Sequence, residues 1–283
     1  MSHSIKGIKE LRMYWNISLR MIMFERILQE AAEVIIKTAG MNQQNDSWHK
    51  EDNDSARSIV TSTDYSIEKA LIDHFSTVLP DYSILSEEKG FLNRGYDKVI
   101  VIDPLDCTKG YKEGKDNYGS FIAIYQQGKC VAGMDLHIPT KTSFIGSEER
   151  FYSNASMEKT GAFYVEFASD ESLNREIERR MAGLVMPIES NAHVLNKVRA
   201  FTGYYEGLVH TRWSYHDLGA APLFGRLTGR KVTDAQGREF EPIDFQRISE
   251  LYSQTNNEIY SIPVVIAKPE LHGRIIDMIK DLF

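Results

Sequence analysis

Apolar residues recur at helical spacing over residues 9–39, near the start of the chain, and Gly40 then supplies a natural stop. This pattern predicts one long amphipathic helix. Residues 41–58 are polar and charged and carry little periodicity. We interpret them as a loop, either a mobile lid or an inert stretch of surface.

Helical and strand-like patterns alternate through much of the remaining chain. A helix is expected to begin where Thr63 or Asp64 can cap it, and to end before Pro80. Residues 118–167 carry mostly antiparallel strand patterns, after which helices and strands alternate. This order predicts a mixed α/β (α+β) fold, a layered αβαβα sandwich. The expected helices are 64–79, 170–182, 191–201, one starting at Asp217, and 269–282; the expected strands include 82–86, 98–102, 183–188 and 262–267.

The length of 283 residues suits a single unit, which we divide into subdomains of about residues 1–168 and 169–283. The net charge of −7 gives no reason to expect a nucleic acid or an anionic membrane as partner, and an anionic substrate would need a bridging cation. Two cysteines, Cys107 and Cys130, imply no disulfide framework and favour a reducing compartment. Without a signal-peptide pattern or an apolar run of transmembrane length, we expect a cytoplasmic protein.

The first candidate chemistry lies in residues 101–108, which read VIDPLDCT. Asp103 follows an apolar strand, and open α/β sheets bind their ligands at such strand ends. The proline that follows favours an extended Asp103, and the turn after it would bring Asp106 and the Leu105 carbonyl back toward Asp103. The same turn would leave the backbone N–H groups of Cys107 and Thr108 available to an anion. An ordinary Asx-Pro turn is the alternative interpretation.

Three further stretches carry acids that could join this pair. Glu87 ends a second strand, Asp64 lies one helical turn before Glu68, and Asp217 opens a helix of small residues. Taken singly, each has an ordinary explanation as a solvated acid or a helix cap. If they converge on Asp103, like charges about 4 Å apart repel by roughly 4 kcal/mol at an effective dielectric near 20. Hard divalent cations would then be required, Mg²⁺ foremost, with Ca²⁺ or Mn²⁺ as competitors.

In order and rough spacing, these blocks resemble the inositol monophosphatase superfamily of Mg²⁺-dependent, often lithium-sensitive phosphatases. The family pattern has Thr-x-x-Asp-x-x-x-Glu, Gly-Glu-Glu at a strand end, Asp-Pro-(Ile/Leu)-Asp-Gly-Thr, and Trp-Asp before a small-residue helix. Here the blocks read TSTDYSIE at 61–68, SEE at 86–88, DPLDCT at 103–108 and HD at 216–217. The resemblance extends over about residues 15–280.

The resemblance implies a hydrolase that cleaves a phosphomonoester with metal-activated water. Two Mg²⁺ ions about 3.5–4 Å apart would stabilise the entering and leaving oxygens, and a weaker third ion would assist. Mn²⁺ could replace Mg²⁺, whereas Ca²⁺ and Li⁺ are expected to inhibit. The implied ligands are Glu87, Asp103 and the Leu105 carbonyl for the first ion, Asp103, Asp106 and Asp217 for the second, and Asp64 for the third. Thr108, with Glu87 or Asp64, would orient the attacking water, and the N–H groups of Cys107 and Thr108 would bind the phosphate.

Several positions depart from the family pattern. Cys107 replaces a glycine, and if this position needs a positive φ, a side chain there costs about 1 kcal/mol or more and could crowd the ligand. His216 replaces a tryptophan, and Ser190-Asn191 replaces a Gly-Ser pair. None of these changes removes a proposed metal carboxylate. The cysteine motivates an alternative function, a catalytically weak regulatory scaffold that binds metal and phosphate. A nucleophilic or redox role for its thiol is not supported, because the sequence shows no pattern of His and Asn partners for it.

Two indications bear on the substrate, which the resemblance implies is a small phosphorylated metabolite. Thr108-Lys109-Gly110 resembles the branch that acts on 3′-phosphoadenosine 5′-phosphate. Tyr204-Tyr205-Glu206 instead resembles the inositol branch, in which the acid contacts a sugar hydroxyl. We favour the nucleotide bisphosphate slightly over inositol monophosphate and place a fructose bisphosphatase-like role third. Related enzymes are commonly homodimers, and the resemblance implies the same assembly here.

Overall fold

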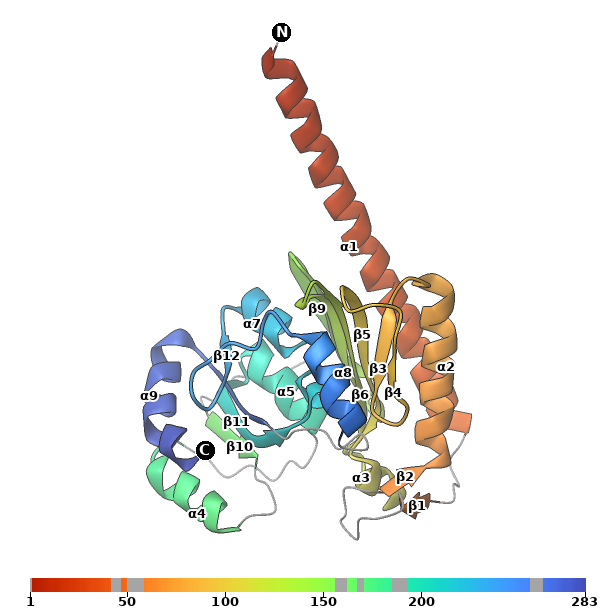
Figure 1. Ribbon diagram of the computed structural model, residues 1–283. Helices are drawn as coiled ribbons and strands as arrows, with labels where there is room; N and C mark the ends of the chain where they lie inside the picture. Colours follow the sequence, from red (N-terminus) through yellow and green to blue (C-terminus); the bar gives the residue numbers. More distant parts are fainter. Residues whose placement is uncertain are drawn as a thin grey trace.

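Two β-sheets form the framework of the computed structural model, which describes residues 2–41, 47–49, 59–155, 162–166, 171–184, 193–254 and 262–283 (Figure 1). Within these residues the larger sheet has seven strands in the order β4-β3-β5-β6-β7-β8-β9, and the smaller has four in the order β10-β11-β13-β12. The larger sheet consists of β3 (Ser83–Ser86), β4 (Gly90–Leu92), β5 (Lys98–Asp106), β6 (Gly119–Gln126), β7 (Lys129–His137), β8 (Thr142–Ser147) and β9 (Arg150–Ser153). The smaller consists of β10 (Ala162–Glu166), β11 (Tyr205–Trp213), β12 (Lys231–Asp234) and β13 (Ile262–Ala267), and β1 (Ser47–His49) pairs with β2 (Ile59–Thr61).

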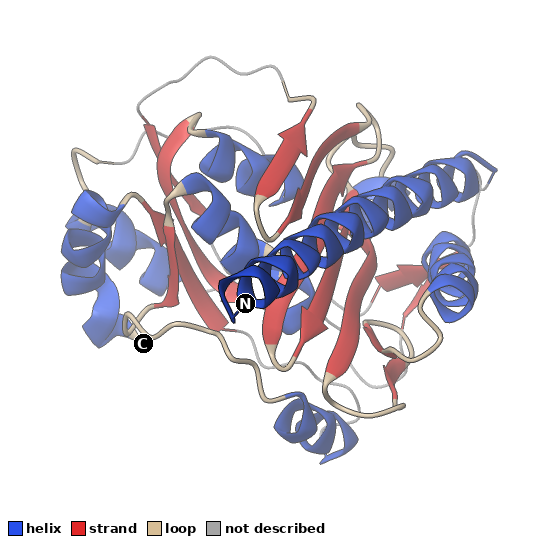
Figure 2. Cartoon of the chain, turned by 90° about the horizontal axis from the view of Figure 1, so that it is seen from above, coloured by secondary structure: helices blue, strands red, loops and turns tan. Residues whose placement is uncertain are grey.

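Helices form three layers around and between the two sheets (Figure 2). On the outer face of the larger sheet lie α1 (Ser2–Met41) and α2 (Ser62–Val78). Between the sheets lie α5 (His193–Thr202), α6 (Tyr215–Leu218) and α7 (Ala221–Thr228), and the outer face of the smaller sheet carries α4 (Glu171–Arg180) and α9 (Pro269–Ile279). The remaining helices are α3 (Thr108–Lys112), α8 (Phe245–Gln254), which packs beside β4, and the short 3₁₀ turn η2 (Lys280–Leu282).

Each interface between layers has its own apolar core. The outer core of the larger sheet packs α1 and α2, through residues such as Leu28 and Leu71, against strand residues such as Ile100. The central core joins the two sheets through the helices between them, and a third core lies under α9. The predicted αβαβα sandwich is therefore confirmed.

The layers between the sheets approach unusually closely at Gly133 of β7. A Cβ atom at this glycine would lie 2.2 Å from the Cβ of Ala220 and 2.9 Å from the carbonyl oxygen of Ile122. Only the absence of a side chain lets the segment between α6 and α7 approach the sheet, because real Cβ atoms do not come this near another carbon. That segment follows directly on Asp217, so the close packing helps to place this acid.

Several predicted boundaries needed correction. The second helix begins at Ser62 with Thr61 as its N-cap, not at Thr63 or Asp64, because the Thr61 side chain accepts the Asp64 N–H. The single helix expected from Asp217 was wrong: α6 and α7 are separate, since Gly219 adopts φ 46° and interrupts them. The strand expected at 98–102 extends to Asp106.

Other expectations fall partly on residues outside the described ranges. Most of the predicted loop at 41–58 lies there, apart from Met41, which ends α1, and the β1 strand, and so do Ser190-Asn191 and residues 185–188 of the predicted strand 183–188. The first two residues of that predicted strand were wrong, since Gly183 and Leu184 lie in a turn in which the Leu184 N–H donates to the Met181 carbonyl. The division near residue 168 stays a prediction; β10, which precedes it, pairs with β11 in the smaller sheet.

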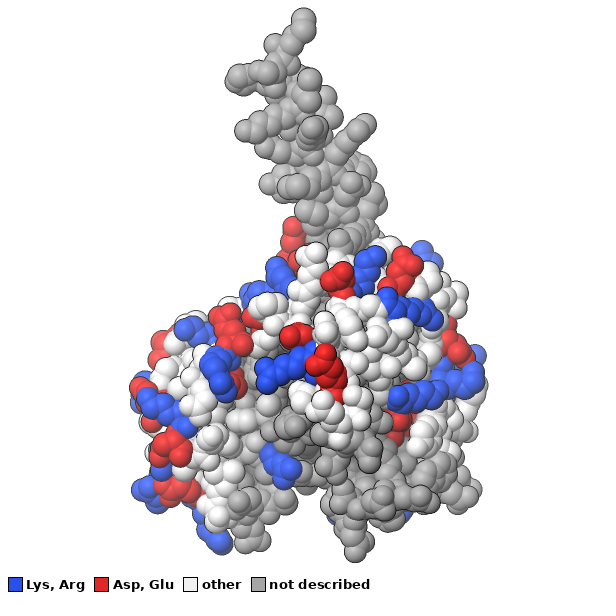
Figure 3. Space-filling view, in the orientation of Figure 1, with Lys and Arg blue, Asp and Glu red and all other residues white. Residues whose placement is uncertain are grey.

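The described surface is mixed in charge. On the face seen in Figure 3, Lys and Arg side chains are interspersed with Asp and Glu, so the described part of this face offers no continuous basic surface for a nucleic acid. Among the described residues, no helix is both long enough and apolar enough to cross a membrane.

Candidate active site

Asp103 and Asp106 lie at the end of β5, where the ladder to β6 is irregular. Asp103 pairs with Phe121 and Asp106 with Gly119, so two residues of β5 stand opposite the single residue Ser120. Residues three apart on a regular strand face opposite sides of a sheet, and this extra residue brings both aspartates to the same side. The bulge also accommodates Pro104, which has no N–H for the ladder.

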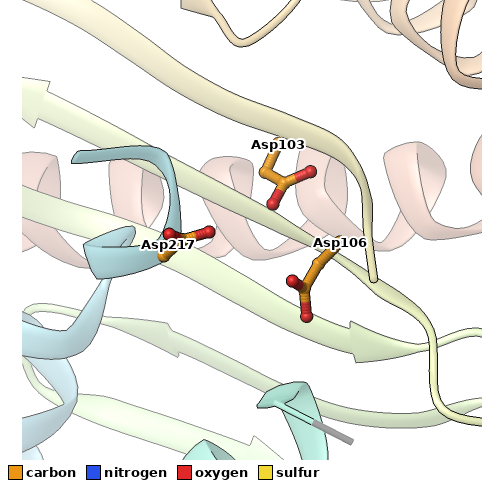
Figure 4. Close-up of side chains that lie close together, drawn as sticks. All are labelled: Asp103, Asp106 and Asp217. Carbon is orange, nitrogen blue, oxygen red and sulfur yellow. The ribbon is translucent and has the colours of Figure 1, made fainter. Parts of the chain in front are cut away.

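Asp217 reaches the same place from α6, between the two sheets. One carboxylate oxygen from each of Asp103, Asp106 and Asp217 lies within 4.8 Å of the other two, and the three side chains converge (Figure 4). Ser214 caps α6: its N–H donates to Asp217 Oδ2 at 2.8 Å, and the Asp217 N–H donates to Ser214 Oγ at 3.2 Å. This reciprocal capping box fixes the aspartate rotamer while its carboxylate contributes to the cluster.

Asp103 is the most confined of these acids, only 2% exposed. Burial raises its pKa well above the usual range, and the negative charges of Glu87, Asp106, Asp217 and Asp64 raise it further, in that order. All four acids predicted to gather round Asp103 therefore act on it electrostatically. The ordinary Asx turn is present too, since the Leu105 N–H donates to Asp103 Oδ1 at 3.1 Å.

The donor set suits a hard divalent cation. Three carboxylates lie close together, those of Asp103 and Asp106 buried and that of Asp217 partly exposed, and like charges this close repel one another strongly without a positive partner. Carboxylate and carbonyl oxygens are the ligands that Mg²⁺ and Mn²⁺ prefer. The residues present therefore fit the metal that the sequence pattern implies.

Asp64 borders the cluster and connects it to the turn after β5. Its Oδ2 accepts the Thr61 N–H at 2.8 Å and the Thr61 hydroxyl, while its Oδ1 accepts the Thr108 hydroxyl at 2.9 Å. Burial is the main reason that the pKa of Asp64 is raised to about 6, although the hydrogen bonds from Thr61 and Thr108 oppose the rise. A carboxylate with this pKa beside a hydroxyl can accept a proton near neutral pH.

Glu68, one turn of α2 after Asp64, stabilises the turn that carries Glu87 at the end of β3. Its buried Oε1 accepts the Ser86 hydroxyl and the N–H groups of Glu88 at 3.2 Å and Lys89 at 3.0 Å. The Glu87 N–H meanwhile donates to the Ile102 carbonyl at 3.2 Å, which ties β3 to β5. Glu68 thus positions the acidic turn.

Comparison with known proteins decides the family. Residues 20–212 match the model described as the inositol monophosphatase family. The chain belongs to the inositol monophosphatase family. It is 26% identical over 211 residues to a fructose-1,6-bisphosphatase/inositol-1-monophosphatase of Thermotoga maritima, a match that covers 68% of this chain and 79% of that protein.

Two further similarities bear on the branch and the fold. Over 92 residues the chain is 27% identical to the 3′(2′),5′-bisphosphate nucleotidase CysQ of Salmonella typhimurium, covering 31% of this chain and 37% of CysQ. A solved structure described as an IMPase/NADP phosphatase complexed with Mg²⁺ and phosphate has a TM-score of 0.68 at 17% identity, covering 98% of this chain and 96% of that one.

Cys107 occupies the position of the family's glycine in the Asp-Pro-x-Asp-Gly-Thr block. Its backbone has φ 62° and ψ 43°. This left-handed conformation is the one that glycine adopts without steric cost. Thr108, next in the chain, donates its hydroxyl toward both Asp64 and the Leu105 carbonyl, whereas the exposed Lys109 has its ammonium 4.0 Å from Glu113.

Glu206 is the predicted site residue that the structure does not bring to the cluster. Glu206 lies at the start of β11, whereas Trp213 lies at the far end of that strand, the end that leads into α6 and Asp217. At the usual rise per residue, Glu206 and Trp213 are about 20 Å apart. Glu206 Oε2 is instead 2.5 Å from Lys268 Nζ, at the start of α9. The geometry therefore gives no support to contact between Glu206 and a substrate held at the carboxylates.

Tyr252 of α8 is a neighbour of the site that the sequence did not indicate. Its hydroxyl lies 3.1 Å from Nε2 of the buried His216, the residue that replaces the family tryptophan. Burial raises the pKa of Tyr252, and the charges of Glu87 and Asp217 add to the rise, so its hydroxyl stays neutral near these acids. Periodicity marks Tyr252 only as a core position, and no motif surrounds it.

Proposed function

We propose that this protein is a phosphomonoesterase dependent on Mg²⁺, acting on a small phosphorylated metabolite. The observation that carries the proposal is the convergence of Asp103, Asp106 and Asp217 within 4.8 Å at a buried strand end. Glu87, Asp103 and the Leu105 carbonyl would hold one ion, Asp103, Asp106 and Asp217 a second, and Asp64 a third. Bound there, the cations would neutralise the carboxylates, attract the phosphate and supply a nucleophile at neutral pH.

The protein's own groups have two tasks in this scheme. Thr108 and Asp64 orient the attacking water, and the hydrogen bond from the Thr108 hydroxyl to Asp64 offers its proton a path to this carboxylate. The backbone N–H groups of Cys107 and Thr108 bind the phosphate oxygens. Little covalent chemistry is required of the side chains, because phosphoryl transfer depends mainly on positioning and charge stabilisation.

For the substrate, we favour 3′-phosphoadenosine 5′-phosphate over inositol monophosphate. The Thr108-Lys109 pair and the partial similarity to a bisphosphate nucleotidase support this choice. Glu206, the main indication for inositol, is paired with Lys268 away from the acids. Mn²⁺ as a substitute, inhibition by Ca²⁺ and Li⁺, a homodimer and a cytoplasmic location are proposed with the activity.

Phosphate release from a panel of esters with Mg²⁺ tests the proposal. The panel contains the adenosine bisphosphate, inositol 1-phosphate and fructose 1,6-bisphosphate, with Asp103→Asn as the inactive control and Glu206→Gln as a matched acid-to-amide control. We expect release that requires Mg²⁺, is abolished by Asp103→Asn and persists in Glu206→Gln. Release that is equal in the wild type and Asp103→Asn would refute the assigned site.

Cys107 favours a second candidate, a metal- and phosphate-binding regulatory scaffold of the same fold. A side chain in the left-handed turn borders the N–H groups proposed to bind phosphate and could crowd the ligand. Binding of Mg²⁺ and phosphate esters in stoichiometric amounts, without release from any ester, would select the scaffold over the enzyme.

A further inference from the structure

A lysine is fully buried between the two sheets, close to the acidic cluster. Lys197 of α5 and Asp135 of β7 have no exposed side-chain surface, and Lys197 Nζ lies 3.2 Å from Asp135 Oδ1. Lysine is rarely buried completely unless it is paired. The ammonium also lies over aromatic rings, 3.9 Å from the centre of Phe121 and 5.3 Å from that of Trp213.

The ammonium has a second partner in the active site. Lys197 Nζ donates to the backbone carbonyl oxygen of Asp217 at 2.7 Å. That carbonyl belongs to the last turn of α6, a helix of only four residues, so a following turn of helix cannot satisfy it. The capping box with Ser214 fixes the Asp217 side chain, and the hydrogen bond from Lys197 fixes its main chain.

Register places the pair beside the metal-binding acids. Asp103, Phe121 and Asp135 form one row across β5, β6 and β7, so their side chains project from the same face of the sheet. Asp135 is thus two strands from Asp103, about 10 Å away, with the Phe121 ring between them. Lys197 spans the distance from this row to the turn that carries Asp217.

Stability alone is a poor explanation for such a pair. Replacing a buried ion pair by apolar side chains of similar volume is often neutral or stabilising, because desolvation offsets the attraction between the charges. The contact that apolar residues could not supply is the hydrogen bond to Asp217.

We propose that Lys197 is a positioning residue for the metal site: its ammonium holds the main chain of Asp217 so that this carboxylate meets Asp103 and Asp106. Asp135 serves as the counterion of the ammonium, so that the positive charge of Lys197 does not repel a bound cation. The inference rests on the proposed metal site, and groups near a site that orient its ligands commonly change metal affinity by about 10- to 100-fold when removed.

The test measures Mn²⁺ affinity in the metal-stripped protein by calorimetry, together with thermal unfolding. The main variant is Asp135→Leu with Lys197→Met, since leucine has the branched skeleton of aspartate and methionine the linear skeleton of lysine. We expect it to unfold at or above the wild-type temperature and to bind Mn²⁺ about 10- to 100-fold more weakly. Asp135→Asn with Lys197→Met replaces it if the leucine does not fold.

Tyr125→Phe is the matched control. The buried Tyr125 hydroxyl donates to the Gly219 carbonyl at 2.6 Å, so this variant removes a different buried donor from the same turn, two residues beyond Asp217. We expect lower thermal stability with Mn²⁺ affinity within about twofold of the wild type. Wild-type Mn²⁺ affinity in the double variant would overturn the role of Lys197 and leave the proposed function standing. Equal Mn²⁺ affinity in the wild type and Asp103→Asn would overturn both.

Discussion

The Thr108 hydroxyl lies 2.9 Å from Asp64 Oδ1 and 2.9 Å from the Leu105 carbonyl oxygen, although Thr108 and Asp64 are 44 positions apart in the chain. A hydroxyl has one hydrogen, so it donates to one of these acceptors at a time. This contact joins the first turn of α2 to the turn after β5, the two segments that border the acidic cluster. In the proposed reaction it is the path by which a proton from water reaches Asp64.

Thr108→Val removes the hydroxyl and keeps the shape of the side chain. We expect kcat for phosphate release to fall by about 100-fold or more, the usual contribution of a positioned proton acceptor, with little change in the midpoint of thermal unfolding. Thr108→Ser, which keeps the hydroxyl, should retain activity within about tenfold. A valine variant as active as the serine variant would show that the hydroxyl has no part in the reaction.

Cys107→Gly should stabilise the protein. At φ 62° the cysteine side chain carries a steric cost that glycine lacks, partly offset by the greater freedom of glycine in the unfolded chain. We expect the free energy of unfolding to rise by about 0.5–1 kcal/mol in denaturant titrations. Cys107→Ala keeps the strain and removes the thiol, so a similar gain in the alanine variant would attribute the effect to the thiol.

Gly133→Ala tests the close approach between β7 and the segment after α6. The new methyl group would overlap Ala220, so we expect a loss of about 1–3 kcal/mol in stability and weaker Mn²⁺ binding as Asp217 shifts from its partners. Gly273→Ala, in α9 with nothing within 4 Å, is the control and should be neutral or stabilising by up to about 1 kcal/mol. Full stability in Gly133→Ala would mean that the layers can separate at no cost.

The stability of the metal-free protein should depend on pH through Asp135. Burial is the main cause that raises its pKa to about 6, with Lys197 opposing the rise, so the folded state binds this proton more tightly than the unfolded state. Stability from this group is therefore fully present below about pH 4 and is lost as pH rises to about 6, a difference of roughly 3 kcal/mol.

Asp135→Asn removes this titration and leaves the other acids in place. The free energy of unfolding of wild type and of Asp135→Asn is measured in denaturant at pH 4 to 7 with a chelator. Wild type should lose stability relative to the variant as pH rises from about 4 to about 6, and the difference should be constant above that. A difference independent of pH, or one that moves in wild type's favour with rising pH, would contradict the assigned environment of Asp135.

The sequence predicted the layers and the acids because both leave local signals. Apolar periodicity and the acids that follow β3 and β5 depend on short stretches of chain, and so do the one-turn spacing of Asp64 and Glu68 and the place of Asp217 before a stretch of small residues. The bulge at Pro104 was not predicted, since it depends on how β5 pairs with β6. The break at Gly219 was missed although a glycine inside a helical pattern is a local signal for one, since glycine readily adopts a positive φ.

The supporting residues left no such signal. Asp135 alternates with apolar neighbours on a buried strand, Lys197 lies on a helix of mixed polarity, and Tyr252 looks like an ordinary core aromatic. Their roles arise from long-range contacts with Asp217 and its surroundings. Glu206 is the opposite case. A local motif predicted that it contacts the substrate, whereas the structure pairs it with Lys268.

Diffraction at the manganese edge, from crystals grown with Mn²⁺ and phosphate, tests the central claim most directly. The account predicts anomalous peaks about 2 Å from carboxylate oxygens of Asp103, Asp106 and Asp217. Folded protein with no peak at these three residues, or with Asp217 directed away from Asp103 and Asp106, would contradict it.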